Sequence, residues 1–156
     1  MTTRYEAIPA PVLKELRETD DAGRATVGYE DAEGGAPLRC CLRKSAAGDR
    51  VALVSYAPLL RWAADEGIDP GAYLELGPIF IHSDECDGPA DGYPHELHAA
   101  NRVFRAYDRK GRIRGGVVVE PGRGEAAAKE WFTDSEVAVI HARAVEFGCF
   151  MFEVRR

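Results

Sequence analysis

The chain has 156 residues, a length that suits one domain with a single sizeable core. Apolar residues make up 46% and charged residues 29%, a balance that excludes an intrinsically disordered chain. The formal net charge is −6 with acidic and basic residues interleaved, so no basic field is present to attract nucleic acid. Apolar runs are far shorter than the roughly 20 residues of a spanning helix. The amino terminus lacks a secretory-signal pattern, so we expect a cytoplasmic protein that does not enter membranes.

The first third of the chain predicts a strand, a helix, a loop and a hairpin. Residues 4–8 have strand character, and the apolar positions of VLKELRE (12–18) have helical spacing. Residues 19–37 are rich in Asp, Gly, Ala and Glu and predict a loop. Residues 38–43 and 51–56 are apolar-rich and flank KSAAGD, so we expect them to pair as an antiparallel hairpin.

The remaining elements follow the same reasoning. Residues 58–66 predict a short helix that Gly67 ends, and residues 76–82 predict a strand that opens into the acidic loop SDECDGPADGYPHE. A hairpin is expected from residues 102–107 and 113–120 around DRKGR, then a helix over 124–131 and a closing strand pair, 137–145 and 149–154. Hairpins with scattered short helices predict one α+β domain over residues 1–156, with a mainly antiparallel sheet and a few short helices packed against it.

Four cysteines, Cys40, Cys41, Cys86 and Cys149, are expected to be free thiols, because a cytosolic chain with a normal core has little use for disulfides. Cys40 and Cys41 are neighbours. If they lie on a strand, their side chains point to opposite faces, and at most one of them can share a site with a third residue.

One hypothesis for the polar residues is a metal cluster of His82, Cys86, His95 and His98, since imidazole and thiolate are the ligands that zinc prefers. The spacing H-x3-C followed by H-x2-H matches no common structural zinc arrangement. We therefore assign no metal from the sequence.

A second hypothesis is thiol chemistry. Cys41 or Cys86 would act as the nucleophile and His82 as the general acid or base, because a thiolate beside an imidazolium is reactive near neutral pH. The residues expected to bind the substrate are Arg39, His141 and Arg143. The function predicted on this basis is a small enzyme that acts on a small polar or anionic molecule.

The alternative is a non-catalytic module that binds a ligand or a protein partner, with self-association through an exposed strand as an option. The chain has no P-loop, no dinucleotide fingerprint, no G-x-S-x-G elbow and no H-E-x-x-H. The residues therefore identify no cofactor, substrate or reaction, and they leave open whether the protein is an enzyme.

The same polar segments carry a family resemblance. PLRCCLRKSAAGDRVALVSYAP, ELGPIFIHSDEC, RAYDRKGRI and VIHARAVEFGCFMFEVRR, in that order, resemble a bacterial family of unknown function, domain-of-unknown-function family 1203. The family usually carries Cys-Arg-x-Cys-Leu in the first segment, so Arg39, Cys41 and Leu42 fit, whereas Leu38 stands where the first Cys would be. This departure argues against a metal site or disulfide built on that pair. The matching polar residues are Arg39, Cys41, His82, Cys86, His141, Arg143 and Cys149, and the resemblance implies no activity.

Overall fold

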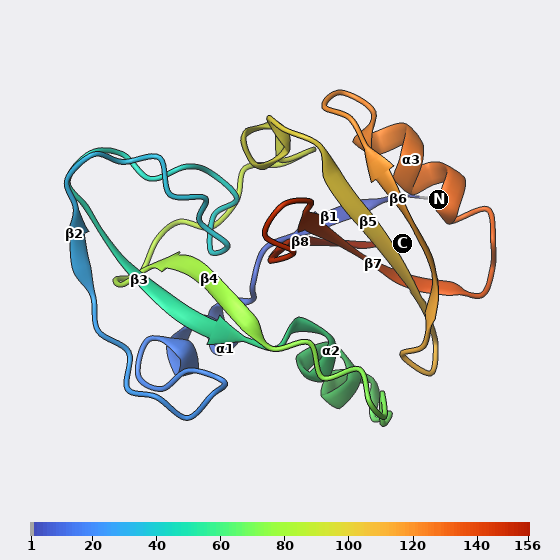
Figure 1. Ribbon diagram of the computed structural model, residues 1–156, viewed down its shortest axis with the longest axis horizontal. Coiled ribbons are helices and arrows are strands. Elements are labelled where there is room, and N and C mark those ends of the chain that lie inside the picture. Colours follow the sequence, from blue (N-terminus) through green and yellow to red (C-terminus); the bar gives the residue numbers. More distant parts are fainter. Residues whose placement is uncertain (1) are drawn as a thin grey trace.

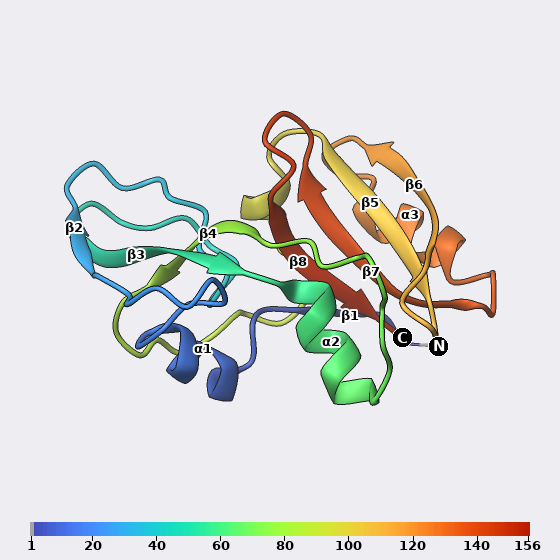
Figure 2. The same cartoon turned by 60° about the horizontal axis from the view of Figure 1, so that its bottom comes forward.

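The structure, a computed structural model, describes residues 2–156 and contains two antiparallel sheets with three helices (Figures 1 and 2). The helices are α1 (Ala10–Leu16), α2 (Pro58–Glu66) and α3 (Gly124–Trp131), with one 3-10 turn, η1 (His95–His98). The strands are β1 (Arg4–Glu6), β2 (Tyr29–Asp31), β3 (Asp49–Tyr56), β4 (Gly77–His82), β5 (Arg102–Asp108), β6 (Ile113–Val119), β7 (Val137–Ala144) and β8 (Phe150–Arg155). This arrangement confirms the α+β class. Within residues 2–156, no helix has the length and apolar character needed to cross a membrane.

The larger sheet has the strand order β1-β8-β7-β5-β6. The two hairpins expected in the second half of the chain are confirmed: β5 pairs with β6, and β7 pairs with β8. β1 lies along the outer edge of β8, with Arg4 opposite Arg155, so the two ends of the chain run side by side (Figure 2). The long-range pairing of β5 with β7 joins the two hairpins into one sheet.

The smaller sheet has the order β2-β3-β4 and lies beside the larger one (Figure 1). Two local predictions were wrong here. Residues 38–43 form a turn and not a strand, so β3 pairs with β2 and β4 instead. β2 lies inside the stretch 19–37 that was expected to be a loop. Three residues are too few to show a period in the sequence, and the pairing with β3 supplies the hydrogen bonds that make them a strand.

Side chains of the larger sheet alternate between an apolar face and a mixed face. Phe104, Ile140 and Phe152 lie on the apolar face, where they pack with α3 and η1 residues in one core cluster. Tyr107 and Val139 lie on the other face against α2, where they contact Leu59 and Trp62. A second cluster fills the space between the smaller sheet and α1, and Phe150 of β8 belongs to it. The larger sheet is therefore covered on both faces.

A pair of Phe variants tests this core assignment. Phe152 is fully buried, with ring contacts to Tyr93 and Phe104, whereas Phe147 is 86% exposed. We expect Phe152→Ala to lower the free energy of unfolding by about 3–5 kcal/mol, because it removes buried apolar surface and leaves a cavity. Phe147→Ala should change it by less than about 0.5 kcal/mol. Urea denaturation followed by circular dichroism measures both, and equal effects would contradict the assignment.

Candidate functional site

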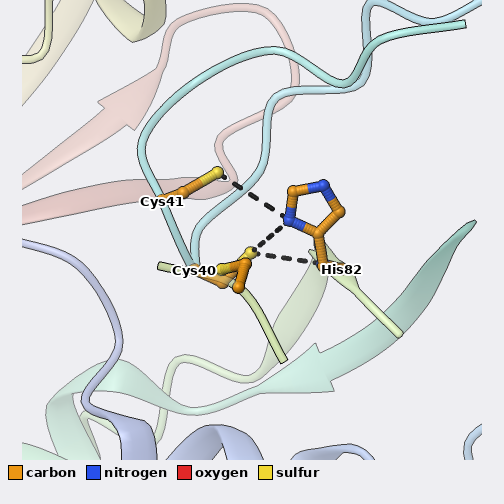
Figure 3. A group of neighbouring side chains, drawn as sticks. Cys40, Cys41 and His82 are labelled. Carbon is orange, nitrogen blue, oxygen red and sulfur yellow. Dashed lines mark hydrogen bonds between the residues drawn. The ribbon is translucent and has the colours of Figure 1, made fainter. Parts of the chain in front are cut away.

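The turn at residues 38–42 brings two neighbouring thiols to one place. The Leu42 N–H donates to the Leu38 carbonyl at 2.9 Å, and Leu42 has a left-handed backbone with φ of 57°. In this tight turn the alternation of a strand does not apply, and Cys40 and Cys41 both lie beside His82 (Figure 3). The expectation that only one of the two thiols could share a site depended on a strand that does not form.

His82 ends β4 and points its imidazole at both sulfurs (Figure 3). Its Nδ1 lies 3.4 Å from the Cys40 Sγ and 3.9 Å from the Cys41 Sγ. The His82 backbone N–H also donates to the Cys40 Sγ at 3.2 Å. On the opposite side of the ring, Nε2 lies 3.2 Å from Oδ2 of Asp49, the first residue of β3. A carboxylate at Nε2 favours the tautomer with its proton there, which leaves the Nδ1 lone pair facing the thiols.

The two thiols have opposite electrostatic environments. The Cys40 thiol donates a hydrogen bond to the Cys41 sulfur, and this is the main reason why the pKa of Cys41 is lowered. The Arg43 backbone N–H and the charge of His82 lower it further, against the effect of burial. The pKa of Cys40 is raised, because that hydrogen bond and burial both keep its proton in place. Cys41 is therefore the thiolate of the pair.

Cys86 is the third thiol at this place. It lies in the loop after β4, and one ligand atom from each of Cys40, Cys41, His82 and Cys86 lies within 4.8 Å of the other three. We call these four residues the Cys/His cluster. The predicted catalytic residues His82, Cys41 and Cys86 are therefore brought together, and Cys40 joins them. Asp49, which contacts His82 from the next strand, was missed, because an Asp after Gly48 has the ordinary signature of a turn.

A cleft of about 1130 Å³ opens beside the cluster. One wall is formed by β1, α1 and the residues between them, and the other by the loop after β4, with Cys40 and Cys86 in the lining. Its charged lining residues are mostly acidic, namely Glu6, Glu18, Asp84, Glu85 and Asp87 against Lys14 and Arg17. The cleft therefore favours cations over anions.

The two other histidines considered as metal ligands lie elsewhere. His98 is buried, with Nε2 2.9 Å from the Val119 carbonyl and Nδ1 2.5 Å from the Tyr93 hydroxyl. The His95 ring contacts Tyr93. Both belong to η1, and neither is part of the Cys/His cluster.

Arg39, predicted to bind substrate, is buried and donates its hydrogen bonds to other parts of the protein. It is 1% exposed, and its Nε donates to the Phe150 carbonyl at 2.7 Å. Nη1 donates to the Pro37 carbonyl, and Nη2 lies 3.4 Å from the Cys149 Sγ. Burial lowers the pKa of the Arg39 guanidinium to about 10, so the side chain remains charged at neutral pH. Its donors are directed at the protein rather than at the cleft.

His141 and Arg143 lie on the mixed face of the larger sheet. His141 is fully buried, and its Nε2 lies 2.9 Å from the Glu153 carboxylate. Although burial alone would raise the pKa of Glu153, the hydrogen bond with His141 and the charge of Arg155 lower it. Arg143 donates to the Gly148 carbonyl and pairs with Glu75 at 3.5 Å. Neither residue belongs to the Cys/His cluster or lines its cleft.

Fold and site together define an α+β protein with a Cys/His cluster at the edge of an acidic cleft. A family model described as a protein of unknown function (DUF1203) matches residues 35–156, so the chain belongs to the DUF1203 family. No curated protein and no solved structure is found to match it. The matched range contains the whole Cys/His cluster, whereas the α1 wall of the cleft precedes it.

The contribution of Arg39 to stability can be tested by replacing its guanidinium, which donates several hydrogen bonds, with the single amine of lysine. We expect Arg39→Lys to lower the free energy of unfolding by about 1–3 kcal/mol, because the Phe150 carbonyl loses a buried hydrogen-bond partner. Arg43→Lys, at an exposed position in the same turn, is the matched control and should stay within about 0.5 kcal/mol of the parent chain. Chemical denaturation measures both. Identical unfolding midpoints for Arg39→Lys and the parent chain would show that the Arg39 hydrogen bonds do not stabilise the fold.

Proposed function

We propose that this protein is a small cytosolic enzyme that uses the Cys41 thiolate as nucleophile and His82 as general acid or base. The observation that carries the proposal is the Cys41 sulfur with its lowered pKa, 3.9 Å from a His82 ring that Asp49 contacts on the other side. A thiolate at neutral pH and an imidazole oriented by a carboxylate are the two parts that nucleophilic cysteine catalysis needs.

The cleft supports a small polar substrate. Arg17 and Ser83 both line it, and within residues 2–156 the Arg17 Nη2 and Ser83 Oγ are buried atoms without a hydrogen-bond partner. If these side chains turn toward the cleft on binding, a polar group of the bound molecule would satisfy both donors. The excess of carboxylates in the lining disfavours an anion, so of the two substrate classes expected from the sequence we retain the uncharged polar molecule.

A non-catalytic binding module is the second candidate. The observation that favours it is burial: Cys40 and Cys41 are each 1% exposed, and of the cluster thiols only Cys40 and Cys86 line the cleft. A nucleophile must reach its substrate, so the enzyme requires a movement that exposes Cys41. The binding module requires no such movement.

Native thiol reactivity separates the two candidates. In buffer with EDTA, we expect iodoacetamide to modify Cys41 faster than Cys149, with half-maximal rate at a pH below the value of about 8.5 for an ordinary thiol. The sign follows from the lowered pKa, which keeps the thiolate populated as the pH falls. Mass spectrometry of timed samples identifies the modified residue. Four uniformly slow thiols would support the binding module.

The contribution of the His82–Asp49 contact is tested by Asp49→Asn. An amide in place of the carboxylate removes the acceptor that orients the His82 ring beside the Cys41 sulfur, so the thiolate loses part of its stabilisation and the pH of half-maximal alkylation should rise. Asp65→Asn, at an exposed position on α2, is the control and should leave the profile unchanged. Superimposable profiles for Asp49→Asn and the parent chain would remove His82 and Asp49 from the mechanism.

A further inference from the structure

We propose that the Cys/His cluster binds a thiophilic divalent metal ion of the zinc class, with Cys40, Cys41, His82 and Cys86 as its four ligands. The sequence spacing assigned no metal, because the ligands considered there came only from residues 82–98. The turn at residues 38–42 supplies two further thiols, those of Cys40 and Cys41.

The ligand distances fit such an ion. Zinc bonds of about 2.3 Å to sulfur and 2.0–2.1 Å to nitrogen place tetrahedral ligand atoms roughly 3.5–3.8 Å from one another. The His82 Nδ1 lies 3.4 Å from the Cys40 Sγ and 3.9 Å from the Cys41 Sγ, and all four ligand atoms lie within 4.8 Å of one another. Small rotations of the side chains therefore close the set around one ion.

The contact of His82 with Asp49 fits metal binding as well. Histidine ligands of metals usually donate their second ring N–H to a carboxylate, which sets the tautomer and orients the ring. The His82 Nε2 lies 3.2 Å from the Asp49 Oδ2, while Nδ1 faces the thiols of Cys40 and Cys41. Asp49 is a positioning residue in this arrangement and not a ligand.

Two electrostatic features favour a bound cation at the Cys/His cluster. Three thiols whose sulfur atoms lie within 4.8 Å of one another cannot all ionise without a cation, because the like charges repel. A bound divalent ion removes this conflict by replacing the protons. The acidic lining of the adjoining cleft draws cations toward the cluster.

Four protein ligands leave a tetrahedral ion without an open position, so the loaded site holds Cys41 as a metal thiolate rather than a free nucleophile. Metal binding would then prevent Cys41 from reacting as a nucleophile, and loss of the metal would restore its reactivity. This regulatory role rests on the proposed function, whereas the metal site itself rests only on the ligand geometry.

The test titrates the chelated full-length protein with Co²⁺ and Zn²⁺. We expect one Co²⁺ per chain, with a thiolate-to-cobalt charge-transfer band and the visible bands of tetrahedral cobalt, and displacement of Co²⁺ by one equivalent of Zn²⁺. Cys86→Ser should lose the stoichiometric site, and Cys149→Ser, at the one cysteine outside the cluster, should keep it. Asp49→Asn should weaken Zn²⁺ binding by about 10–100-fold. Far-UV circular dichroism of each metal-free variant confirms that it is folded.

Each outcome is decisive. Absence of a stoichiometric ion, an unchanged spectrum in Cys86→Ser, or an equal loss in Cys149→Ser would each overturn the metal site. Zinc that binds to a protein whose chelated thiols all react slowly would keep the metal site and overturn the proposed enzyme. Rapid alkylation of Cys41 in a protein that binds no metal would keep the proposed enzyme and overturn the metal site. If both proposals hold, one equivalent of Zn²⁺ should suppress Cys41 alkylation, and EDTA should restore it.

Discussion

The fold and the site both depend on the buried Arg39. Its backbone N–H donates to the Phe80 carbonyl of β4, and its carbonyl accepts from the Ile8 N–H ahead of α1. Its side chain donates to the Phe150 carbonyl of β8. One residue thus ties the smaller sheet, the amino-terminal segment and the larger sheet together. A buried guanidinium is costly unless its donors are paired, so its environment is strongly determined. Because Cys40 and Cys41 follow it directly, the same bonds position the thiols.

His141 and Arg143, which the sequence grouped with the cysteines as site residues, lie on β7 and apart from the Cys/His cluster. His141 and Arg143 are two residues apart on β7, so they share a face and meet Glu153 and Glu75 there. These pairs are buried or half-buried, and each base has a carboxylate partner. The contacts with Glu153 and Glu75 account for the buried positions of these two side chains without a ligand. The three thiols and His82 gather instead at the end of β4, where a turn and a loop meet the strand end.

Metal binding, as proposed, would give the Cys/His cluster a second chemical state. Without a metal, Cys41 carries the charge while Cys40 keeps its proton, and His82 faces both. With a metal, all three thiols would be deprotonated and His82 would remain neutral, which Asp49 supports through the far ring nitrogen. The acidic cleft is consistent with both, because it admits cations and uncharged polar molecules in preference to anions.

Local sequence patterns predict the α+β class, the two hairpins of the larger sheet, all three helices, and three of the four cluster residues as functional candidates. These follow from local information: periodicity, turn residues such as Gly67, and residue chemistry. The turn at residues 38–42 and strand β2 became known only from the three-dimensional fold. The fold also showed that Cys40 joins the cluster, with Asp49 behind His82. Those features depend on hydrogen bonds to distant residues, such as that of Arg39 with Phe80, and a local pattern carries no information about partners so far along the chain.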